Sequence, residues 1–375
     1  MEHGGVGMVQ SLAHAPERKA FEQLGVLFSA FASQTPWGGH ATGLTETEYT
    51  AFVRHIKQAE HQNGWFTSEN VRHALGGLAD LLKPEALAPW LARYNRGPED
   101  LQRTIGLVLA GNVPLVGFHD LLCVLLAGHR ARVKVSSQDA GLTSGVVELL
   151  RVLDPGVGAR VELVDGRLGD IDAIIATGSD NTARYFHHYF GGLPRMVRQG
   201  RVSVAVLDGS ETSDELAALG EDVFRYFGLG CRNVAKIYVP QDFDLDRFFG
   251  AIVPWHGIIQ HHKYANNYTY HKAIWLMDRV SLLENGFLLV KEDEAALASP
   301  VGSLYVQRYT DLGVVKDVVQ QQAGHIQCVV GHAGLLGPGV DLVPFGQSQF
   351  PGPADYADGM DTLKFLLTLP QGVNS

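Results

Sequence analysis

The stretch YFGLGCRNVAK, residues 226–236, places a cysteine between glycines and basic residues. A thiol becomes a useful nucleophile when nearby positive groups or a helix N-terminus stabilise its thiolate. Arg232 and Lys236 are such positive groups, and the flanking glycines let the backbone approach a ligand closely. Cys231 is therefore a candidate nucleophile whose own N–H could face an oxyanion. The alternative is a structural cysteine in a tight turn.

The other two cysteines favour a structural role. Cys123 lies within an apolar helical run, and Cys328 alternates with Ile326 and Val330 in a strand-like run, so both are predicted to lie in the core. An odd number of cysteines without a CxxC pair argues against a disulfide framework and favours a reducing cytoplasm. The 16 histidines form no HExxH or similar metal-binding spacing, so no metal site is predicted.

Two strand–glycine–helix junctions could bind negative groups. In AGNVPLVG, residues 110–117, the amide of Asn112 could donate to a developing negative oxygen. The alternative is an N-cap asparagine with Pro114 in the first helical turn. In ATGSDNTARYF, Gly178 and Ser179 could contact a pyrophosphate, or the segment could be an ordinary capped helix. The GxGxxG dinucleotide fingerprint does not follow the first strand.

Composition and charge narrow the class of protein. The 375 residues carry a net charge of -10 with no dense basic stretch, which argues against a non-specific nucleic-acid binder. No apolar run reaches the length of roughly 18 residues that a membrane helix needs. The N-terminal segment lacks the pattern of a signal peptide, so a cytoplasmic protein is expected.

The pattern of elements predicts an α/β fold. Residues 1–100 are predicted to be helical, with a capping box of Thr45 and Glu48. From residue 104 onward, short apolar strands alternate with helices, which indicates parallel βαβ units in a doubly wound sheet. A second such unit begins near residue 212 and contains the cysteine turn. A histidine-rich stretch follows, with His261, His262 and His271, and is read as a solvated polar helix or loop or as a source of an acid–base group.

Taken together, these segments resemble the aldehyde dehydrogenase superfamily in order and spacing over residues from about 100 to 370. LAGNVPLVGFHDLLCVLLAGHRARVKVSSQD, ATGSDNTARYF, FGLGCRN and VPFGQSQ carry that resemblance. GLGCRNVAKIYVP, HHKYANNYTYHKA and PADYADGMDTLKFLL resemble its acyl-CoA reductase branch, the LuxC-like family. The resemblance implies two doubly wound Rossmann-like parallel-sheet domains with an N-terminal helical region. The implied bounds are 1–100 for the helical region, 101–208 for the NADP(H)-binding domain, 209–345 for the catalytic cysteine domain and 346–375 for an oligomerisation segment.

The resemblance also implies roles for individual residues. Cys231 matches the catalytic nucleophile, and Asn112 matches the asparagine that shares the oxyanion with the N–H of Cys231. Lys134 matches the lysine that meets the adenosine ribose, and Ser136 and Ser137 follow it as cofactor-binding residues. The family's pyrophosphate turn corresponds to Gly178 and Ser179. The final run TLKFLLTL is expected to be a strand that resembles the family's oligomerising end.

Two departures from the aldehyde dehydrogenase pattern predict the direction of the reaction and the cofactor. The glutamate that activates water in those enzymes would fall near Val197, and no carboxylate lies between residues 181 and 207. Without that base, a thioester on the enzyme should resist hydrolysis. Ser137 stands in place of a glutamate that would repel a 2′-phosphate, so NADPH is the expected cofactor.

The resemblance therefore implies a long-chain acyl-CoA reductase that converts a fatty acyl thioester to an aldehyde. Its expected partners are an acyl-CoA or an acyl donor protein, and it is expected to form a homo-oligomer. Two alternatives remain open: a reductase of acyl phosphates of the glutamyl-phosphate reductase type, and a non-catalytic subunit that retains the fold. The sequence does not indicate which of the histidines would assist Cys231.

Overall fold

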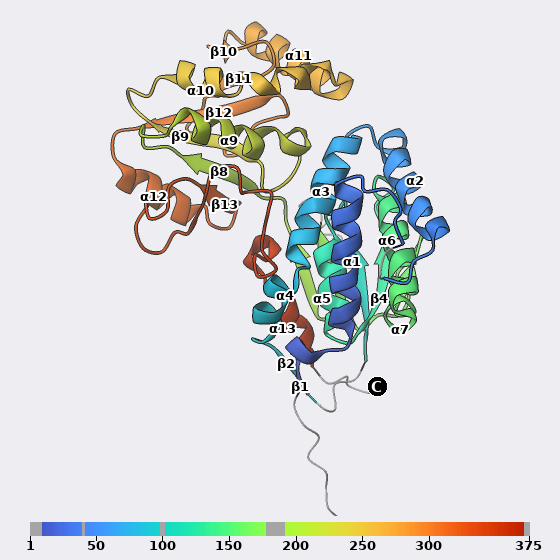
Figure 1. Ribbon diagram of the computed structural model, residues 1–375. Helices are drawn as coiled ribbons and strands as arrows, with labels where there is room; N and C mark the ends of the chain where they lie inside the picture. The colour runs from blue at the N-terminus through green and yellow to red at the C-terminus, as the bar shows by residue number, and fades with distance from the viewer. Residues whose placement is uncertain (1–9, 40–41, 98–101, 178–191, 371–375) are drawn as a thin grey trace, which may run out of the picture. The chain divides into compact units, whose positions relative to one another are not determined.

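The structure is a computed structural model, in which the chain divides into two compact units (Figure 1). It describes residues 10–39, 42–97, 102–177 and 192–370. The first unit comprises Met1–Gln199 together with Pro351–Ser375, and the second comprises Gly200–Phe350. The second unit is thus one continuous segment, whereas the first is built from two segments that are distant in sequence.

Four helices form the N-terminal part of the first unit: α1 (Glu17–Ala32), α2 (Glu46–Gln62), α3 (Ser68–Leu81) and α4 (Pro84–Leu91). The predicted capping box at the start of α2 is confirmed, because Thr45 accepts from the N–H of Glu48 and the Glu48 carboxylate accepts from the N–H of Thr45 at 2.7 Å. Before and after these helices, the short strands β1 (Gln10–Ser11) and β2 (Asn95–Arg96) pair with each other in an antiparallel arrangement.

A parallel five-stranded sheet forms the remainder of the first unit. Its strands are β3 (Thr104–Val108), β4 (Arg130–Lys134), β5 (Val161–Leu163), β6 (Ala173–Thr177) and β7 (Arg195–Arg198), and the helices between them are α5 (Phe118–Leu126), α6 (Ala140–Leu153) and α7 (Pro155–Gly158). The strand order is β5-β4-β3-β6-β7, with every pairing parallel. The chain therefore winds outward in both directions from β3, and the carboxyl ends of β3 and β6 flank the point at which ligands bind in such sheets. The predicted doubly wound class is confirmed.

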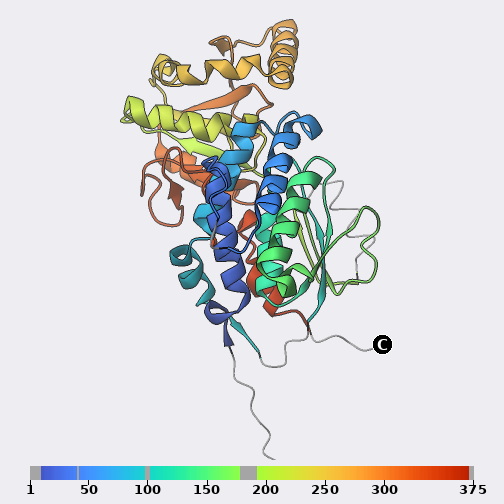
Figure 2. The same cartoon turned by 45° about the vertical axis from the view of Figure 1, so that its right-hand side comes forward.

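The side chains of these strands alternate between two apolar clusters. Ile105 and Leu107 of β3 belong to the main core beneath the helices, and the neighbouring Ile174 and Ala176 of β6 belong to a smaller cluster with Leu168. Figure 2 shows α1, α2 and α6 stacked beside the strands of this sheet. This alternation is the period of two that strands covered on both faces require.

The C-terminal segment of the first unit corrects one prediction, because TLKFLLTL forms a helix and not a strand. Helix α13 (Thr362–Leu367) begins after Asp361, whose side chain accepts from the N–H of Lys364. Leu363 and Leu366 lie on one helical face and are fully buried in the main core. Their spacing of three residues is helical, and the N-cap aspartate reinforces it.

The second unit contains a seven-stranded sheet. Its strands are β8 (Val202–Val206), β9 (Val234–Pro240), β10 (Leu283–Glu284), β11 (Leu289–Glu292), β12 (Ser303–Tyr309), β13 (Ile326–Val330) and β14 (Leu342–Val343). The order is β10-β11-β12-β9-β8-β13-β14, and only the edge strand β10 is antiparallel among these pairings. The amino ends of β8 and β9 lie side by side at the centre of the sheet, where the Cys231 segment enters β9.

Helices cover both faces of this second sheet: α9 (Ser213–Phe224), α10 (Leu245–Ala251), α11 (His262–Met277) and α12 (Leu312–Gln321). Leu219 of α9 and Phe248 of α10 pack in one cluster, whereas Val315 and Val319 of α12 pack on the opposite face. The histidine-rich stretch forms the 3-10 segment Val253–Gln260 followed by α11, which agrees with its reading as a helix. Within the part of the chain that the structure describes, no helix has both the length and the apolar character to cross a membrane.

Candidate active site

Cys231 lies in a four-residue turn, Gly230–Asn233, immediately before β9; we refer to these residues as the Cys231 turn. Two hydrogen bonds join the ends of the turn. The N–H of Gly230 donates to the side-chain oxygen of Asn233 at 2.8 Å, and the N–H of Asn233 donates to the carbonyl of Gly230 at 3.0 Å. Cys231 is half-buried. The fold therefore presents this cysteine within a closed turn just before β9 and does not enclose it in the core.

The segment that leads into the Cys231 turn has an unusual backbone. Helix α9 ends at Phe224, and Tyr226, Phe227 and Gly228 then follow with φ values of 54°, 59° and 76°. This left-handed region suits glycine, but each residue with a side chain there costs on the order of 1–3 kcal/mol. Strain of this kind persists only where the surrounding contacts impose it, and it is concentrated at functional sites.

A buried hydroxyl anchors the other side of the Cys231 turn. Ser203 of β8 is 0% exposed, and its Oγ donates to the carbonyl of Cys231 at 3.0 Å. The same Oγ lies 3.1 Å from the sulfur of Cys328. The prediction for Cys328 is wrong in one respect, because this cysteine is half-buried: the pairing of β13 with β8 shifts register between Ile326 and Val329 and interrupts the alternation. Cys123 is fully buried in the core, as predicted.

The segment VPFGQSQ, which follows β14, is tied to the Cys231 turn and to α9. Asp222 of α9 accepts from the N–H groups of Gly346 at 2.6 Å and Ser348 at 2.9 Å. The guanidinium of Arg232 donates to the carbonyl of Ser348 at 2.5 Å. Burial raises the pKa of Asp222, and the hydrogen bonds from Ser348 and Gly346 oppose that shift. Both carboxylate oxygens of Asp222 are therefore engaged in holding this loop.

Among the three histidines that the sequence singled out, His261 packs against the segment that leads to Cys231. Its ring stacks on Phe227 with the ring centroids 4.2 Å apart. His262 is exposed at the start of α11. His271 packs against Tyr270 and Trp275 further along that helix, and burial lowers its pKa.

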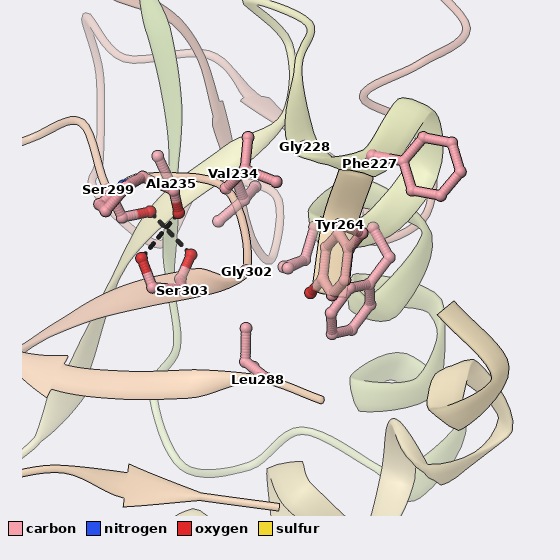
Figure 3. Close-up of a pocket in the computed structure, with 13 residues that line it drawn as sticks. Phe227, Gly228, Val234, Ala235, Tyr264, Leu288, Ser299, Gly302 and Ser303 are labelled. Carbon is pink, nitrogen blue, oxygen red and sulfur yellow. Dashed lines mark hydrogen bonds between the residues drawn. The ribbon is translucent and has the colours of Figure 1, made fainter. Parts of the chain in front are cut away.

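A small cavity lies beside the residues that precede Cys231 (Figure 3). Phe227, Gly228, Tyr264 and Leu288 are among its lining residues, and its volume is about 20 Å³. The turn Ser299–Ser303 closes one side, where the Ser299 hydroxyl donates to the carbonyl of Ser303 at 2.9 Å and the Ser303 hydroxyl to the carbonyl of Pro300 at 2.7 Å. A cavity of this size holds about one water molecule and is too small for a ligand.

Asn112 lies in the first unit, in the turn between β3 and α5, and it is exposed. Helix α5 begins only at Phe118 with Gly117 as its N-cap, so Asn112 is not the capping residue of that helix. Asp139 at the start of α6 stabilises this turn. Its Oδ2 accepts from the N–H of Leu115 at 3.2 Å and from the Thr143 hydroxyl at 3.1 Å. Leu115 has a φ of 55°, so this contact stabilises a left-handed residue.

Asp139 is itself unusual. It is 3% exposed, and its Oδ1 has no hydrogen-bond partner among the described residues. Burial raises the pKa of this carboxyl group to about 7, against the opposing effect of the bonds from Leu115 and Thr143. A carboxylate in an apolar environment favours its neutral form, because ionisation would leave a charge without water.

The candidate cofactor-binding residues follow the neighbouring strand, β4. Lys134 and Ser137 are exposed and Ser136 is half-buried. The two loops approach closely, because a Cβ atom added at Gly111 would lie 2.4 Å from the hydroxyl oxygen of Ser136. Residues 109–117 connect β3 to α5, and we call them the Asn112 turn. The structure therefore brings the Asn112 turn next to Ser136, at the carboxyl ends of β3 and β4. Gly178 and Ser179 lie outside the described residues, and Cys231 belongs to the second unit.

These residues fit one end of a dinucleotide in chemical type. Lys134 supplies an exposed cation and Ser136 and Ser137 supply hydroxyl groups at the edge of the sheet where such ligands bind. Asp139, the first carboxylate after them, turns into the interior to bond Leu115 and Thr143. No ionised carboxylate in the described 134–139 segment therefore faces a phosphate group.

Sequence reasoning missed the residues that hold the two turns. Asn233 and Ser203 bond the Cys231 turn, and Asp139 bonds the Asn112 turn. Asn233 could have been found from the sequence, because it is a polar residue two positions after the cysteine. Ser203 and Asp139 reach their partners only through the fold, so their spacing in sequence carries no such signal.

A group of charged side chains gathers at the carboxyl ends of β8 and β13. Ligand atoms of Asp208, Glu211 and His332 lie within 4.8 Å of one another. Protein groups already engage them, because Glu211 accepts from the N–H groups of Asp208 and Gly209, and His332 bonds Glu215 at 2.9 Å. This arrangement is explained by hydrogen bonds within the protein.

The chain was compared with protein-family models and with solved structures. Residues 69–248 match the family model described as acyl-CoA reductase (LuxC). No curated protein matches the chain. An NADP dependent enzyme from E. coli superposes with a TM-score of 0.61 and 14% identity, over 89% of this chain and 79% of that chain. An oxidoreductase from Marinobacter aquaeolei gives 0.58 and 14%, over 89% and 84%.

A third solved structure, a lactaldehyde dehydrogenase, superposes with a TM-score of 0.57 and 12% identity, over 89% of this chain and 79% of that chain. At such identities the similarity establishes the fold alone. That fold is aldehyde dehydrogenase-like, as the resemblance of the sequence segments predicted, and the resemblance to the LuxC family is confirmed by the family match.

Proposed function

Because residues 69–248 of this chain match the acyl-CoA reductase (LuxC) family, we propose that the protein reduces a fatty acyl-CoA to the corresponding aldehyde with NADPH. The observation that carries the proposal is the geometry of Cys231, a half-buried thiol in a closed turn whose neighbours are bonded on both sides. A nucleophile needs such access together with a fixed backbone.

Cys231 forms the covalent intermediate in this proposal. Its thiolate attacks the carbonyl carbon of the acyl-CoA, the tetrahedral intermediate collapses, and the thiolate of CoA leaves. The amide of Asn112 and the N–H of Cys231 are assigned to the oxyanion. When bound, NADPH supplies the hydride that reduces the enzyme thioester. The aldehyde then leaves and the Cys231 thiolate is regenerated.

Two features support reduction over hydrolysis of the acyl-enzyme. No carboxylate lies between residues 181 and 207. This segment resembles the part of aldehyde dehydrogenases that carries the water-activating glutamate. Asp222, a buried carboxylate close in sequence to Cys231, uses both oxygens to accept backbone N–H groups of Gly346 and Ser348. A carboxylate so engaged is poorly suited to activate water.

The cofactor assignment is supported by Lys134, Ser136 and Ser137, with Gly178 and Ser179 as the proposed pyrophosphate turn. Since Asp139 points inward and has a raised pKa, the turn after β4 lacks the negative charge that would reject a 2′-phosphate. His261 is the histidine that we assign to assist the departing or attacking thiol, because it packs on the segment that leads to Cys231. We further propose a cytoplasmic homo-oligomer that accepts its acyl group from free CoA or from an acyl donor protein.

The test is turnover with a series of acyl-CoA esters, followed by NADPH oxidation and aldehyde formation. Cys231→Ser should lower kcat by about 10⁴-fold or more, because the covalent route is lost, and should leave NADPH binding intact. Cys123→Ala is the matched control, since that cysteine is buried in α5, and it should retain turnover. Substantial acyl-CoA-dependent NADPH oxidation by Cys231→Ser would refute the assignment. Preference for an acyl phosphate over the CoA ester would favour the glutamyl-phosphate reductase type.

A further inference from the structure

We infer that Asn233 is the positioning residue of the nucleophile: its side chain fixes the left-handed segment before Cys231 and the Cys231 turn as one rigid piece. This inference rests on the proposed function, because the position of Cys231 matters for chemistry only if its sulfur attacks the substrate. Neither the family match nor the sequence motifs assign a role to Asn233.

The side-chain amide of Asn233 spans the whole segment. It is 3% exposed, and its nitrogen donates to the carbonyls of Arg225 at 2.8 Å and Asp222 at 3.0 Å, with a longer contact to Val223 at 3.5 Å. Its oxygen accepts from the N–H of Gly230 at 2.8 Å. One planar group thus joins the end of α9 to the residue that precedes Cys231.

The backbone explains why an amide is needed here. The last carbonyls of a helix lack partners within the helix, and a buried carbonyl without a partner costs about 1–3 kcal/mol. The left-handed turn at Tyr226 and Phe227 leads the chain away before ordinary helical bonds can form. A carboxylate could accept from Gly230 but could not donate to the carbonyls, and an ammonium group could do only the reverse. An amide carries two N–H donors and an oxygen acceptor in one side chain, which are the groups that this segment uses.

The backbone of Asn233 transmits this constraint to the sheet. Its carbonyl accepts from the N–H of Ser203 at 3.1 Å, and the hydroxyl of Ser203 donates to the carbonyl of Cys231 at 3.0 Å. The peptide groups on both sides of Cys231 are therefore fixed relative to β8. The direction of the Cys231 N–H and the starting point of its side chain follow from these bonds.

The experiment compares Asn233→Asp with a matched substitution, Asn285→Asp. Asn285 lies in a turn of the same unit, where its oxygen accepts from the N–H groups of Leu288 at 3.0 Å and Phe287 at 3.3 Å. Both variants replace a turn-forming asparagine with its closest isostere. For each we would measure the rate of Cys231 alkylation by iodoacetamide across pH, read from the modified peptide, together with kcat, KM and urea unfolding.

We expect Asn233→Asp to slow alkylation of Cys231 at neutral pH about tenfold and to move its midpoint to higher pH, because a carboxylate two residues away disfavours the thiolate and the turn is loosened. A displaced nucleophile can lower kcat by about 10²-fold, while KM for NADPH should stay within twofold. Asn285→Asp should leave alkylation and kcat within about twofold of the wild type. If Asn233→Asp does not unfold cooperatively, Asn233→Ser replaces it; because serine adds no charge, slower alkylation and a lower kcat in that variant would come from the loosened turn alone.

Wild-type alkylation and wild-type kcat in Asn233→Asp would overturn the inference, as would equal losses in both variants. The alkylation measurement needs no substrate. If the wild-type protein failed to reduce acyl-CoA esters, the proposed function would fall, and the alkylation profiles would still decide the role of Asn233.

Discussion

The Cys231 turn and the Asn112 turn each precede or follow a central strand, and each contains or follows left-handed residues that carry side chains. They are held by different chemistry. A neutral amide, Asn233, satisfies both ends of the segment around Cys231. A buried carboxyl group, Asp139, bonds the N–H of Leu115 and leaves one of its own oxygens without a partner among the described residues.

The side chain that holds the Cys231 turn therefore does not titrate, whereas the side chain that holds the Asn112 turn does. The amide of Asn233 keeps the same donors and acceptor at every physiological pH. Asp139 has a raised pKa of about 7, so its charge changes close to neutrality. The two turns should therefore respond differently to pH, and the following predictions test that contrast from the largest expected effect to the smallest.

The first prediction concerns the group that the Asn112 turn presents. Asn112→Ala should lower kcat by about 10²–10³-fold, because one oxyanion donor is lost, and should leave the alkylation of Cys231 unchanged. Asn267→Ala is the control, since the Asn267 amide donates to the Lys263 carbonyl one turn earlier on α11. Equal kcat values in Asn112→Ala and the control would mean that the Cys231 turn alone supports the oxyanion.

The second prediction concerns the ionisation of Asp139. Burial raises the pKa of Asp139 from 3.8 to about 7, so the folded protein keeps a proton that the unfolded chain has lost across this window. The free energy of unfolding should therefore fall as pH rises through it, by up to roughly 1.4 kcal/mol per pH unit. Asp139→Asn keeps an acceptor for Leu115 and should remove that loss, so the variant should be more stable than the wild type at pH 8.

Urea unfolding at pH values from 4 to about 8 measures this effect. Asp154→Asn serves as the control, because it removes a carboxylate at the N-cap of α7 in the same unit and should leave the pH-dependent loss in place. An unaltered pH dependence in Asp139→Asn would show that Asp139 is not the titrating group.

The third prediction tests the close approach of the Asn112 turn to the candidate cofactor loop. A Cβ atom at Gly111 would lie 2.4 Å from the Ser136 oxygen and 2.6 Å from its Cβ. Gly111→Ala should cost about 1–3 kcal/mol, as overpacking does, and should raise KM for NADPH. The double variant Gly111→Ala with Ser136→Gly should recover much of the stability. No recovery would place the clash elsewhere, and thermal unfolding with NADPH kinetics distinguishes the two results.

The smallest effect is expected at His332, a titrating group in the second unit. Its hydrogen bond to Glu215, and then that to Asp208, raise its pKa. Its contribution to stability is therefore complete below the unfolded value of 6.5 and is lost as pH rises through the raised value. His332→Gln should cost at most about 1 kcal/mol near pH 6, less at pH 8, and should not alter kcat. The exposed His256→Gln is the control; a large change in kcat on His332→Gln would link this charged group to the Cys231 turn.

Much of the fold could be predicted because short sequence patterns determine many of its strands and helices. The apolar runs at Thr104–Val108 and Ala173–Thr177 form the central strands, and the capping box at Thr45 and Glu48 starts a helix. These signals depend on neighbours in sequence. The final segment was mispredicted as a strand because a short apolar run fits either element, and the core contacts of Leu363 and Leu366 decide in favour of the helix.

The site was predictable in its reactive groups and not in their supports. Cys231 and Asn112 stand out by residue type beside glycine and proline. Strand β7 (Arg195–Arg198) was missed because its arginines hide a short buried strand, in which Arg198 pairs with Asp120 at 2.6 Å. The partners Ser203 and Asp139 depend equally on contacts distant in sequence, and no local pattern encodes those.

The division of the chain has a consequence during synthesis. The first unit needs Leu363 and Leu366 to complete its core, and Arg198 reaches forward to the Thr362 hydroxyl at 2.7 Å. The ribosome delivers these residues only after every residue of Gly200–Phe350 has emerged. The whole sequence of the second unit is therefore available for folding before that of the first unit. The core of the first unit stays incomplete until helix α13 has been synthesised.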